Sequence, residues 1–245
     1  MKEALLYEKL DGGRVRCRLC AHRCTIADGR RGVCVVRENR GGTLYSLVYG
    51  MLLSQAVDPI EKKPLFHFYP GSGALSIATA GCNFACEFCQ NASISQMVRD
   101  QGRIMGRETS AEEVVRAARQ HDCRSIAYTY TEPTIFFEYT YDIARLAHAV
   151  GIASVYVTNG YITPEALDEI GPYLDAWRVD VKGFSDDLYR NLTGIPHWRG
   201  ILDIAERARH KWDMHVEVVT NIVPGMNDDD EQLGGIARWI HDKLD

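Results

Sequence analysis

The sequence lacks the features of membrane-spanning, secreted and disordered proteins. No apolar run approaches the ~18 residues that are needed to cross a bilayer. Charged residues interrupt the first twenty positions, where a secretory signal would need an apolar core. There is no internal repeat and no low-complexity segment. With 46% hydrophobic and 25% charged residues, the 245-residue chain has the composition of a globular protein of one or two domains.

A strong net charge is also missing. The formal charge is −5, so the composition does not indicate nucleic-acid binding. Residues 1–40 nevertheless hold ten Lys and Arg against five Asp and Glu. This basic stretch is either a solvated face or a contact for a phosphate or an acidic partner.

Cysteine is too sparse for a disulfide-stabilised secreted domain, in which it usually exceeds ~8–10% of a short chain. The eight cysteines are clustered instead, apart from Cys123, which we expect to be a buried free thiol. Without a signal peptide, such clusters are typical of metal sites in the reducing cytoplasm, where we expect this protein. The clusters are Cys17, Cys20, Cys24 and Cys34, and then Cys82, Cys86 and Cys89.

The first 72 residues are predicted to form a small cysteine-rich N-terminal extension with a connector. Residues 1–40 show little apolar periodicity, so a metal would substitute for a core that they lack. A strand is predicted over 43–49, between glycines. The stretch Asp58–Ser72 contains three prolines and is predicted to be ordered but largely irregular.

Residues 73–245 are predicted to form a second unit in which strands and helices alternate. Ser110 and Thr163 stand where helix caps are needed, and Asn227 is predicted to open the last helix, which runs to about Lys243. The predicted strands are 74–80, 125–129, 153–157, 176–181 and 215–223, and helices begin near 110, 133, 163, 185, 200 and 227.

Five consecutive strand–helix units imply parallel strands with right-handed crossovers. The fold class is therefore α/β, either a (β/α) barrel or a doubly wound sheet. In both folds, ligands bind at the carboxyl ends of the strands. The residues that follow the predicted strands are thus the candidate site.

The first of these strands is followed by cysteines spaced C-x3-C-x2-C. Structural zinc normally takes four protein ligands. Cys82, Cys86 and Cys89 would instead hold a 4Fe–4S cluster and leave one iron open for a substrate or cofactor. A zinc site with a fourth ligand from elsewhere, or buried structural thiols, is the alternative interpretation.

This motif, with the aromatic Phe88 before its last cysteine, resembles the signature of the radical S-adenosylmethionine (radical SAM) superfamily. The resemblance implies a partial (β/α)6-type barrel in which the open iron binds S-adenosylmethionine. The cofactor is then cleaved reductively to a deoxyadenosyl radical that abstracts hydrogen from a substrate. A one-electron donor such as flavodoxin or ferredoxin is implied as well. Phe88 would pack against the adenine, or else belong to the core.

The other strand ends carry groups that fit the same cofactor under this resemblance. Singly, each group has an ordinary structural explanation, such as a turn, a helix start or a salt-bridged pair. The resemblance implies Thr131 and Glu132 for the methionyl amine, Thr158 and Asn159 for the ribose or carboxylate, Lys182 for the carboxylate with Asp180 as its neighbour or a cation ligand, and Val223 near the adenine. Related activases commonly carry an acidic residue where this chain has Val157, so a monovalent-cation site is not expected there. No catalytic residue is assigned.

The four N-terminal cysteines suit either a closed tetrahedral zinc site or an auxiliary iron–sulfur cluster, with zinc slightly favoured. Cys34, the most distant of the four, is the one that could remain free.

From about residue 14 onward, the chain resembles a narrower family, the radical SAM enzyme of the AmmeMemoRadiSam system, which is related to the activating enzymes of pyruvate formate-lyase. The resemblance implies Memo-like and AMMECR-like partners but no substrate. In its most specific part, Lys62, Lys63 and His67 are expected to reach either the barrel mouth or solvent. The matching segments are Val15–Cys20, Gly32–Cys34, Arg37–Arg40, Asp58–Phe68 and Cys89–Asn91.

The sequence thus favours a radical SAM enzyme that abstracts hydrogen from a substrate. Two alternatives remain open: an activase that acts on a glycine of another protein, and a non-catalytic iron–sulfur or zinc module for electron transfer or binding. Barrels of this branch usually have six strand–helix units, and five are predicted here. We therefore expect the sequence to be a fragment.

Overall fold

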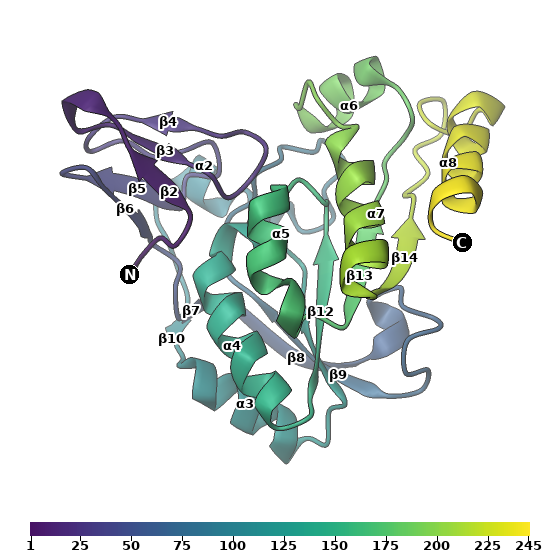
Figure 1. The fold of residues 1–245 in the computed structure, drawn as a ribbon, viewed down its shortest axis with the longest axis horizontal. Coiled ribbons are helices and arrows are strands. Elements are labelled where there is room, and N and C mark those ends of the chain that lie inside the picture. The colour runs from purple at the N-terminus through teal and green to yellow at the C-terminus, as the bar shows by residue number, and fades with distance from the viewer.

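A computed structural model describes residues 1–245 and contains a six-stranded sheet at its centre (Figure 1). The strand order is β14-β13-β12-β11-β9-β8. The α/β fold and its five parallel strands are confirmed, and the sixth strand, β8 (Ser54–Pro59), runs antiparallel to β9. The parallel strands are β9 (Gly73–Ala78), β11 (Ser125–Tyr128), β12 (Ala153–Thr158), β13 (Ala176–Asp180) and β14 (His215–Val219).

Helices cover one face of the sheet (Figure 1). Along β9, Leu75 and Ile77 point toward this helical layer, whereas Ala74 belongs to a separate apolar cluster on the other face. This alternation is the two-residue period of a strand that is buried on both sides. The helices of this layer are α3 (Ala111–Gln120), α4 (Phe137–Ala149), α5 (Pro164–Ile170) and α7 (Gly200–Trp212). In Figure 1, α6 (Asp186–Thr193) lies beyond the carboxyl ends of the strands, and α8 (Asp230–Lys243) lies beside β14.

The opposite face is filled by the segment that follows β8. Ile60, Leu65 and Phe68 are buried there against Ala127 and Val155. The segment is largely irregular, as predicted, apart from one 3-10 turn over Ile60–Lys62. It closes the inner side of the sheet, where a complete barrel would place further strands.

The helix caps are those predicted from the sequence, with one exception. Ser110 and Glu113 form the predicted capping box, and the Thr163 hydroxyl accepts from the N–H of Ala166. The last helix begins later than predicted, because Asp229 caps it and not Asn227. The Asn227 side chain is fully buried and bonds to loop backbone, so it shapes the preceding loop.

Short elements complete the chain, and several predicted boundaries move. The strand predicted over 43–49 ends at Ser46, and the one predicted over 215–223 ends at Val219. No helix combines the length and the apolar character that spanning a membrane requires. The remaining elements are β7 (Met51–Leu52), β10 (Arg107–Glu108), α1 (Ala92–Ser95), α2 (Met97–Gln101) and 3-10 turns at Asp11–Gly13, Pro133–Phe136 and Gly171–Tyr173.

The expectation that residues 1–40 lack a core is wrong. Val15, Leu19, Ile26 and Val36 are buried and join the main apolar core of the molecule. Their strands are only two to four residues long, too short to show a period in the sequence. Two three-stranded sheets result, from β1 (Lys2–Glu3), β6 (Thr43–Ser46) and β5 (Arg37–Arg40), and from β2 (Tyr7–Lys9), β3 (Val15–Cys17) and β4 (Thr25–Ile26).

Candidate functional site

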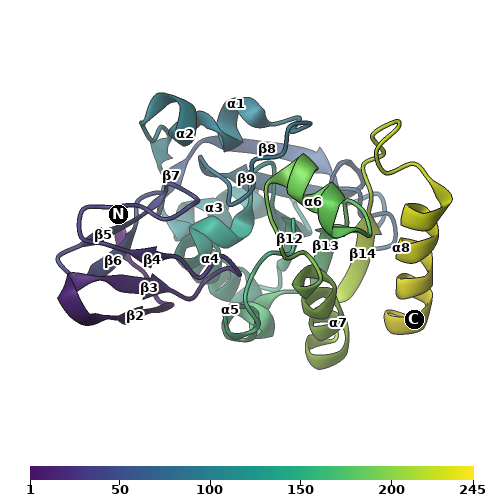
Figure 2. The same cartoon turned by 90° about the horizontal axis from the view of Figure 1, so that it is seen from above.

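The residues predicted from the strand ends gather at one edge of the sheet, seen from above in Figure 2. The five parallel strands are paired side by side, so their carboxyl ends meet there. In strand order, these ends are followed by Cys82–Cys89, Thr131–Glu132, Thr158–Asn159, Asp180–Lys182 and Val223.

The three cysteines of the loop after β9 are free and partly exposed. The N–H of Phe84 donates to Cys82 Sγ at 3.4 Å, and Cys89 Sγ lies 3.3 Å from Ser95 Oγ. No three thiol, imidazole or carboxylate groups of the chain stand close enough to hold a single metal ion. In a 4Fe–4S cluster each thiolate binds a different iron, so the ligands stand farther apart. Three cysteines are also one ligand fewer than a structural zinc site normally takes.

A buried lysine lies beside these cysteines. Burial raises the pKa of Cys86 to about 11, and the positive charge of Lys182 opposes the increase. Burial alone would lower the pKa of Lys182, but Asp180 and Cys86 reverse this and raise it. Its Nζ also lies 5.3 Å from the centre of the Phe88 ring. Lys182 thus stays charged and faces both the cysteine loop and the predicted adenine contact.

Asn83 anchors the cysteine loop, although the sequence did not single it out. It is buried, and its Oδ1 accepts from Asn159 Nδ2 at 2.8 Å. Its carbonyl oxygen lies 2.8 Å from His22 Nε2 in the N-terminal extension. Gly81 precedes the loop with a φ of +106°, where a Cβ would stand 2.8 Å from Val36. The loop is therefore fixed between the β12 end and the extension.

Glu132 ties two strand ends together. Its buried carboxylate accepts from the Thr134 N–H and hydroxyl, from the Thr158 hydroxyl and from the Asn159 N–H, at 2.6–3.0 Å. Burial raises its pKa, and these donors oppose the increase. The Thr131 hydroxyl donates to the Thr79 carbonyl, so it points back to the first strand. The predicted contacts of these residues with a cofactor amine stay predictions.

Asp180 has two cationic partners. Lys182 Nζ donates to it at 3.1 Å, and Arg178 donates to its other oxygen. Arg178 is buried, and its register partner on β12 is Val157. Burial acts to raise the pKa of Asp180, but Lys182 and Arg178 outweigh it, so the pKa falls. The residue paired with Val157 in the sheet is thus an arginine, and this arginine donates to Asp180.

Val223 is linked to the β13 end through one buried asparagine. It lies in the loop after β14, and its N–H donates to Asn227 Oδ1 at 2.7 Å. Asn227 Nδ2 in turn donates to the carbonyl of Lys182 at 2.8 Å. The Asn227 side chain thereby attaches the loop to the backbone at the β13 end.

The four N-terminal cysteines converge on one small cavity of about 10 Å³, which His22 and Arg37 also line. Cys17, Cys20 and Cys34 are buried and Cys24 is partly exposed. Burial raises the pKa of Cys34 to about 11, an increase that the Arg37 charge opposes. All four thiols therefore belong to one group, including Cys34, while Cys123 is the expected isolated buried thiol.

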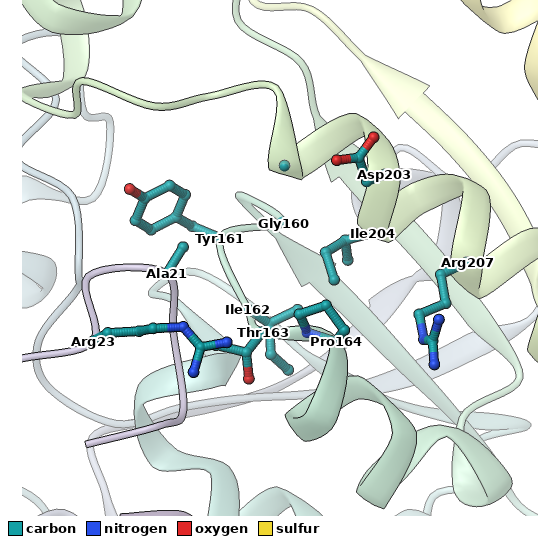
Figure 3. Close-up of a pocket in the computed structure, with 11 residues that line it drawn as sticks. Ala21, Arg23, Gly160, Tyr161, Ile162, Thr163, Pro164, Asp203, Ile204 and Arg207 are labelled. Carbon is teal, nitrogen blue, oxygen red and sulfur yellow. The ribbon is translucent and has the colours of Figure 1, made fainter. Parts of the chain in front are cut away.

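A larger cavity of about 230 Å³ lies elsewhere, between the extension and α7 (Figure 3). Ala21 and Arg23 line it on one side, and Asp203, Ile204 and Arg207 on the other. None of the predicted cysteine or cofactor residues lines it. Arg23 and Arg207 are already paired with Glu165 and Asp168. The cavity is therefore not the predicted site.

A buried ion pair joins the end of β8 to the segment that follows it. Asp58 accepts from Lys62 and Lys63, each at 2.7 Å, and from the Tyr130 hydroxyl. Lys63 is buried, whereas the side chains of Lys62 and His67 are largely exposed. Tyr130 directly precedes Thr131, and it has a φ of +63°. The most specific part of the sequence resemblance thus connects the inner face of the sheet to the β11 end.

Replacing Asp58 by asparagine is expected to destabilise the protein by about 2 kcal/mol at pH 7, the scale of a buried hydrogen bond to a charged group. Burial acts to raise the pKa of Asp58, but the bonds from Lys62, Lys63 and Tyr130 outweigh it and lower the pKa. The stabilisation is therefore complete above the ordinary aspartate pKa of about 4 and is lost as the pH falls through the lower folded value. Urea unfolding at several pH values measures this.

The deficit of the Asp58→Asn variant should shrink as the pH falls below 4. The exposed Asp203 provides the control Asp203→Asn, which should change stability by less than about 0.5 kcal/mol at pH 7. A deficit that stayed constant down to pH 3 would contradict an ionised Asp58.

A family model gives the decisive comparison. The model described as the radical SAM superfamily matches residues 76–240, from the first parallel strand into the last helix. The chain belongs to the radical SAM superfamily. The three cysteines, the carboxyl ends of the five parallel strands and helices α3 to α7 all lie within the match.

Curated relatives place this radical SAM protein among enzymes. An uncharacterized protein of Methanocaldococcus jannaschii is 43% identical over 244 residues, which is 100% of this chain and 71% of that protein. The pyruvate formate-lyase 1-activating enzyme of Escherichia coli K12 is 25% identical over 171 residues, 66% of each chain. The 4-hydroxyphenylacetate decarboxylase activating enzyme of Clostridioides difficile matches over 37% of its own length. The chain is a radical SAM enzyme with activating enzymes among its relatives.

Solved structures agree with the fold. A radical SAM methyltransferase from Sphaerobacter thermophilus has a TM-score of 0.56 and 20% identity, covering 72% of this chain and 55% of that one. At this identity the likeness supports the α/β radical SAM fold alone.

Sequence reasoning missed three residues at this radical SAM site: Asn83, Arg178 and His22. Arg178 stands two residues before Asp180 on β13, so the two-residue period of a strand places both on one face. That signal was present in the sequence. Asn83 and His22 have no such signal, because their contacts join segments 61 residues apart.

Proposed function

We propose that this radical SAM enzyme binds a 4Fe–4S cluster through Cys82, Cys86 and Cys89 and binds S-adenosylmethionine beside it. One observation carries the proposal: the loop after the first parallel strand holds three free thiols, and one of them, Cys86, lies near the buried, charged Lys182 at the end of the fourth parallel strand. Three cysteines in a C-x3-C-x2-C pattern suit a 4Fe–4S cluster that leaves one iron open. When bound, such a cluster supplies the electron that cleaves S-adenosylmethionine to a deoxyadenosyl radical, which takes hydrogen from a substrate.

The chain's own residues bind and orient in this proposal. Lys182 offers a fixed positive charge to the cofactor carboxylate, and Asp180 with Arg178 holds that lysine in place. Glu132 fixes the β11 and β12 ends, so that Thr158 and Asn159 face the same edge. The buried Phe84 and the half-buried Phe88 exclude water around the cysteine loop.

The proposal extends to further components. A one-electron donor such as flavodoxin or ferredoxin reduces the cluster, and the four N-terminal cysteines hold a second metal, either zinc or iron–sulfur. Eight free thiols favour a reducing compartment, the cytoplasm. The narrower sequence resemblance adds Memo-like and AMMECR-like proteins as partners.

A second candidate is an activase that forms a radical on a glycine of another protein. Relatives named as activating enzymes, at 20–25% identity, favour it. A glycyl-radical partner encoded nearby, with an electron paramagnetic resonance signal that depends on this enzyme, would support it.

Anaerobic reconstitution with iron and sulfide is expected to give a brown protein with 4Fe–4S absorbance. Adding dithionite and S-adenosylmethionine should then produce deoxyadenosine, measured by chromatography and mass spectrometry. Omitting dithionite is the control and should abolish the product. A fully reconstituted protein that forms no deoxyadenosine and binds no S-adenosylmethionine by calorimetry would instead support an electron-transfer or binding module.

A further inference from the structure

The four cysteines of the extension meet although they come from separate turns. Cys17 ends β3, Cys20 and Cys24 lie on either side of the turn before β4, and Cys34 precedes β5. The Cys17 N–H donates to the Cys24 carbonyl at 2.9 Å, which fixes the turn. Their common cavity, about 10 Å³, is the size of one bound water or ion.

Arg37 also lines this cavity and is incompletely paired. Its side chain is 2% exposed, and Nη2 donates to the fully buried carboxylate of Glu138. Its Nε and Nη1 are buried and have no hydrogen-bond partner. A buried guanidinium with unused donors is unfavourable unless an acceptor is supplied.

Two kinds of side chain in the cavity lining can accept a hydrogen bond from Arg37. They are the four cysteines and the His22 ring. The other lining side chains are apolar: Leu19, Ile26, Val33 and Ile135. His22 Nε2 already contacts the Asn83 carbonyl. A neutral thiol is a weak acceptor, whereas a metal-bound cysteine is deprotonated outright and carries negative charge. Four thiolates around one divalent ion have a net charge of −2. Because this charge is buried, a neighbouring cation stabilises it.

We infer that Cys17, Cys20, Cys24 and Cys34 bind a metal centre as four thiolates and that Arg37 is its buried counter-cation, donating N–H to sulfur. The inference deepens the second-site part of the proposed function and does not depend on the Cys82–Cys89 loop. No three of the thiols are within reach of one ion as they stand. Binding therefore takes a rotation of these side chains toward one ion or, for an iron–sulfur cluster, a widening of the cavity.

The first test uses the full chain with Cys82, Cys86 and Cys89 all replaced by alanine, so that the barrel cluster is absent. Elemental analysis is expected to find one zinc, or about four iron with matching sulfide, per chain. Adding Cys17→Ser and Cys24→Ser should remove this metal, and Cys123→Ser should leave it. Zinc and iron outcomes both support the site and identify the metal. A folded triple variant with neither metal, after supplying zinc or iron and sulfide, would overturn it.

The second test addresses Arg37. The double variant Arg37→Leu/Glu138→Leu removes both charges together and so leaves no buried unpaired ion. Its metal affinity, measured by competition with a chelator, is expected to fall about 10–100-fold, the usual loss when a residue beside the ligands is removed. Arg37→Lys with Glu138 retained should lose less. Unchanged affinity in the double variant would refute the role of Arg37. Because the barrel cluster is measured separately by deoxyadenosine formation, its failure and the failure of this centre are distinguishable.

Discussion

Replacing Cys86 with alanine is expected to reduce deoxyadenosine formation to the background of an assay without enzyme. Only three cysteines are present on the loop after β9, so two would remain, and a 4Fe–4S cluster needs three protein ligands to leave one iron for the cofactor. Cys86 is also the thiol on which the charge of Lys182 acts. The cluster absorbance of the reconstituted protein should fall together with the product.

Cys123→Ala is the matched control for this variant. Cys123 is a buried thiol at the far end of the first strand, where its Sγ lies near Gly73. Its replacement should leave both cluster absorbance and deoxyadenosine formation near the wild-type level. Deoxyadenosine formation at the wild-type rate by the Cys86→Ala enzyme would contradict the proposed function.

Replacing Glu138 with leucine is expected to lower the free energy of unfolding by about 3–5 kcal/mol, the usual cost of breaking a buried ion pair by removing one partner. Glu138 and Arg37 join α4 to β5, and both side chains are almost completely buried. Glu138 also accepts from the Leu5 N–H at 3.0 Å, which holds the N-terminus. Urea unfolding followed by circular dichroism measures the loss.

Two companion variants calibrate this result. The double variant Arg37→Leu/Glu138→Leu should recover much of the loss, since no charge is then left unpaired. Arg190→Ala breaks an exposed pair with Asp187 and should change stability by less than about 0.5 kcal/mol. A Glu138→Leu loss of similar small size would show that the buried pair does not hold the extension on α4.

Much of the central fold could be predicted because each strand is a short apolar run between turn signals. All five parallel strands were identified, and the capping box at Ser110 and the cap at Thr163 were correct to the residue. β8 was missed because it is an edge strand with polar residues, and Asp58 within it is buried by an ion pair and not by apolar packing. The core of the extension was missed because its strands are too short to display a period.

The sequence by itself determined the cysteine spacings, the order of the strand ends and hence the residues that meet at one edge, since parallel strands must bring their carboxyl ends together. Only the tertiary structure decided which of those residues touch. It placed Lys182 beside Cys86 and surrounded Glu132 with donors. It also placed Arg37, with two unused N–H donors, in the lining of the cavity that the four N-terminal cysteines share. These contacts join distant segments, and burial and charge pairing, which no local spacing encodes, determine them.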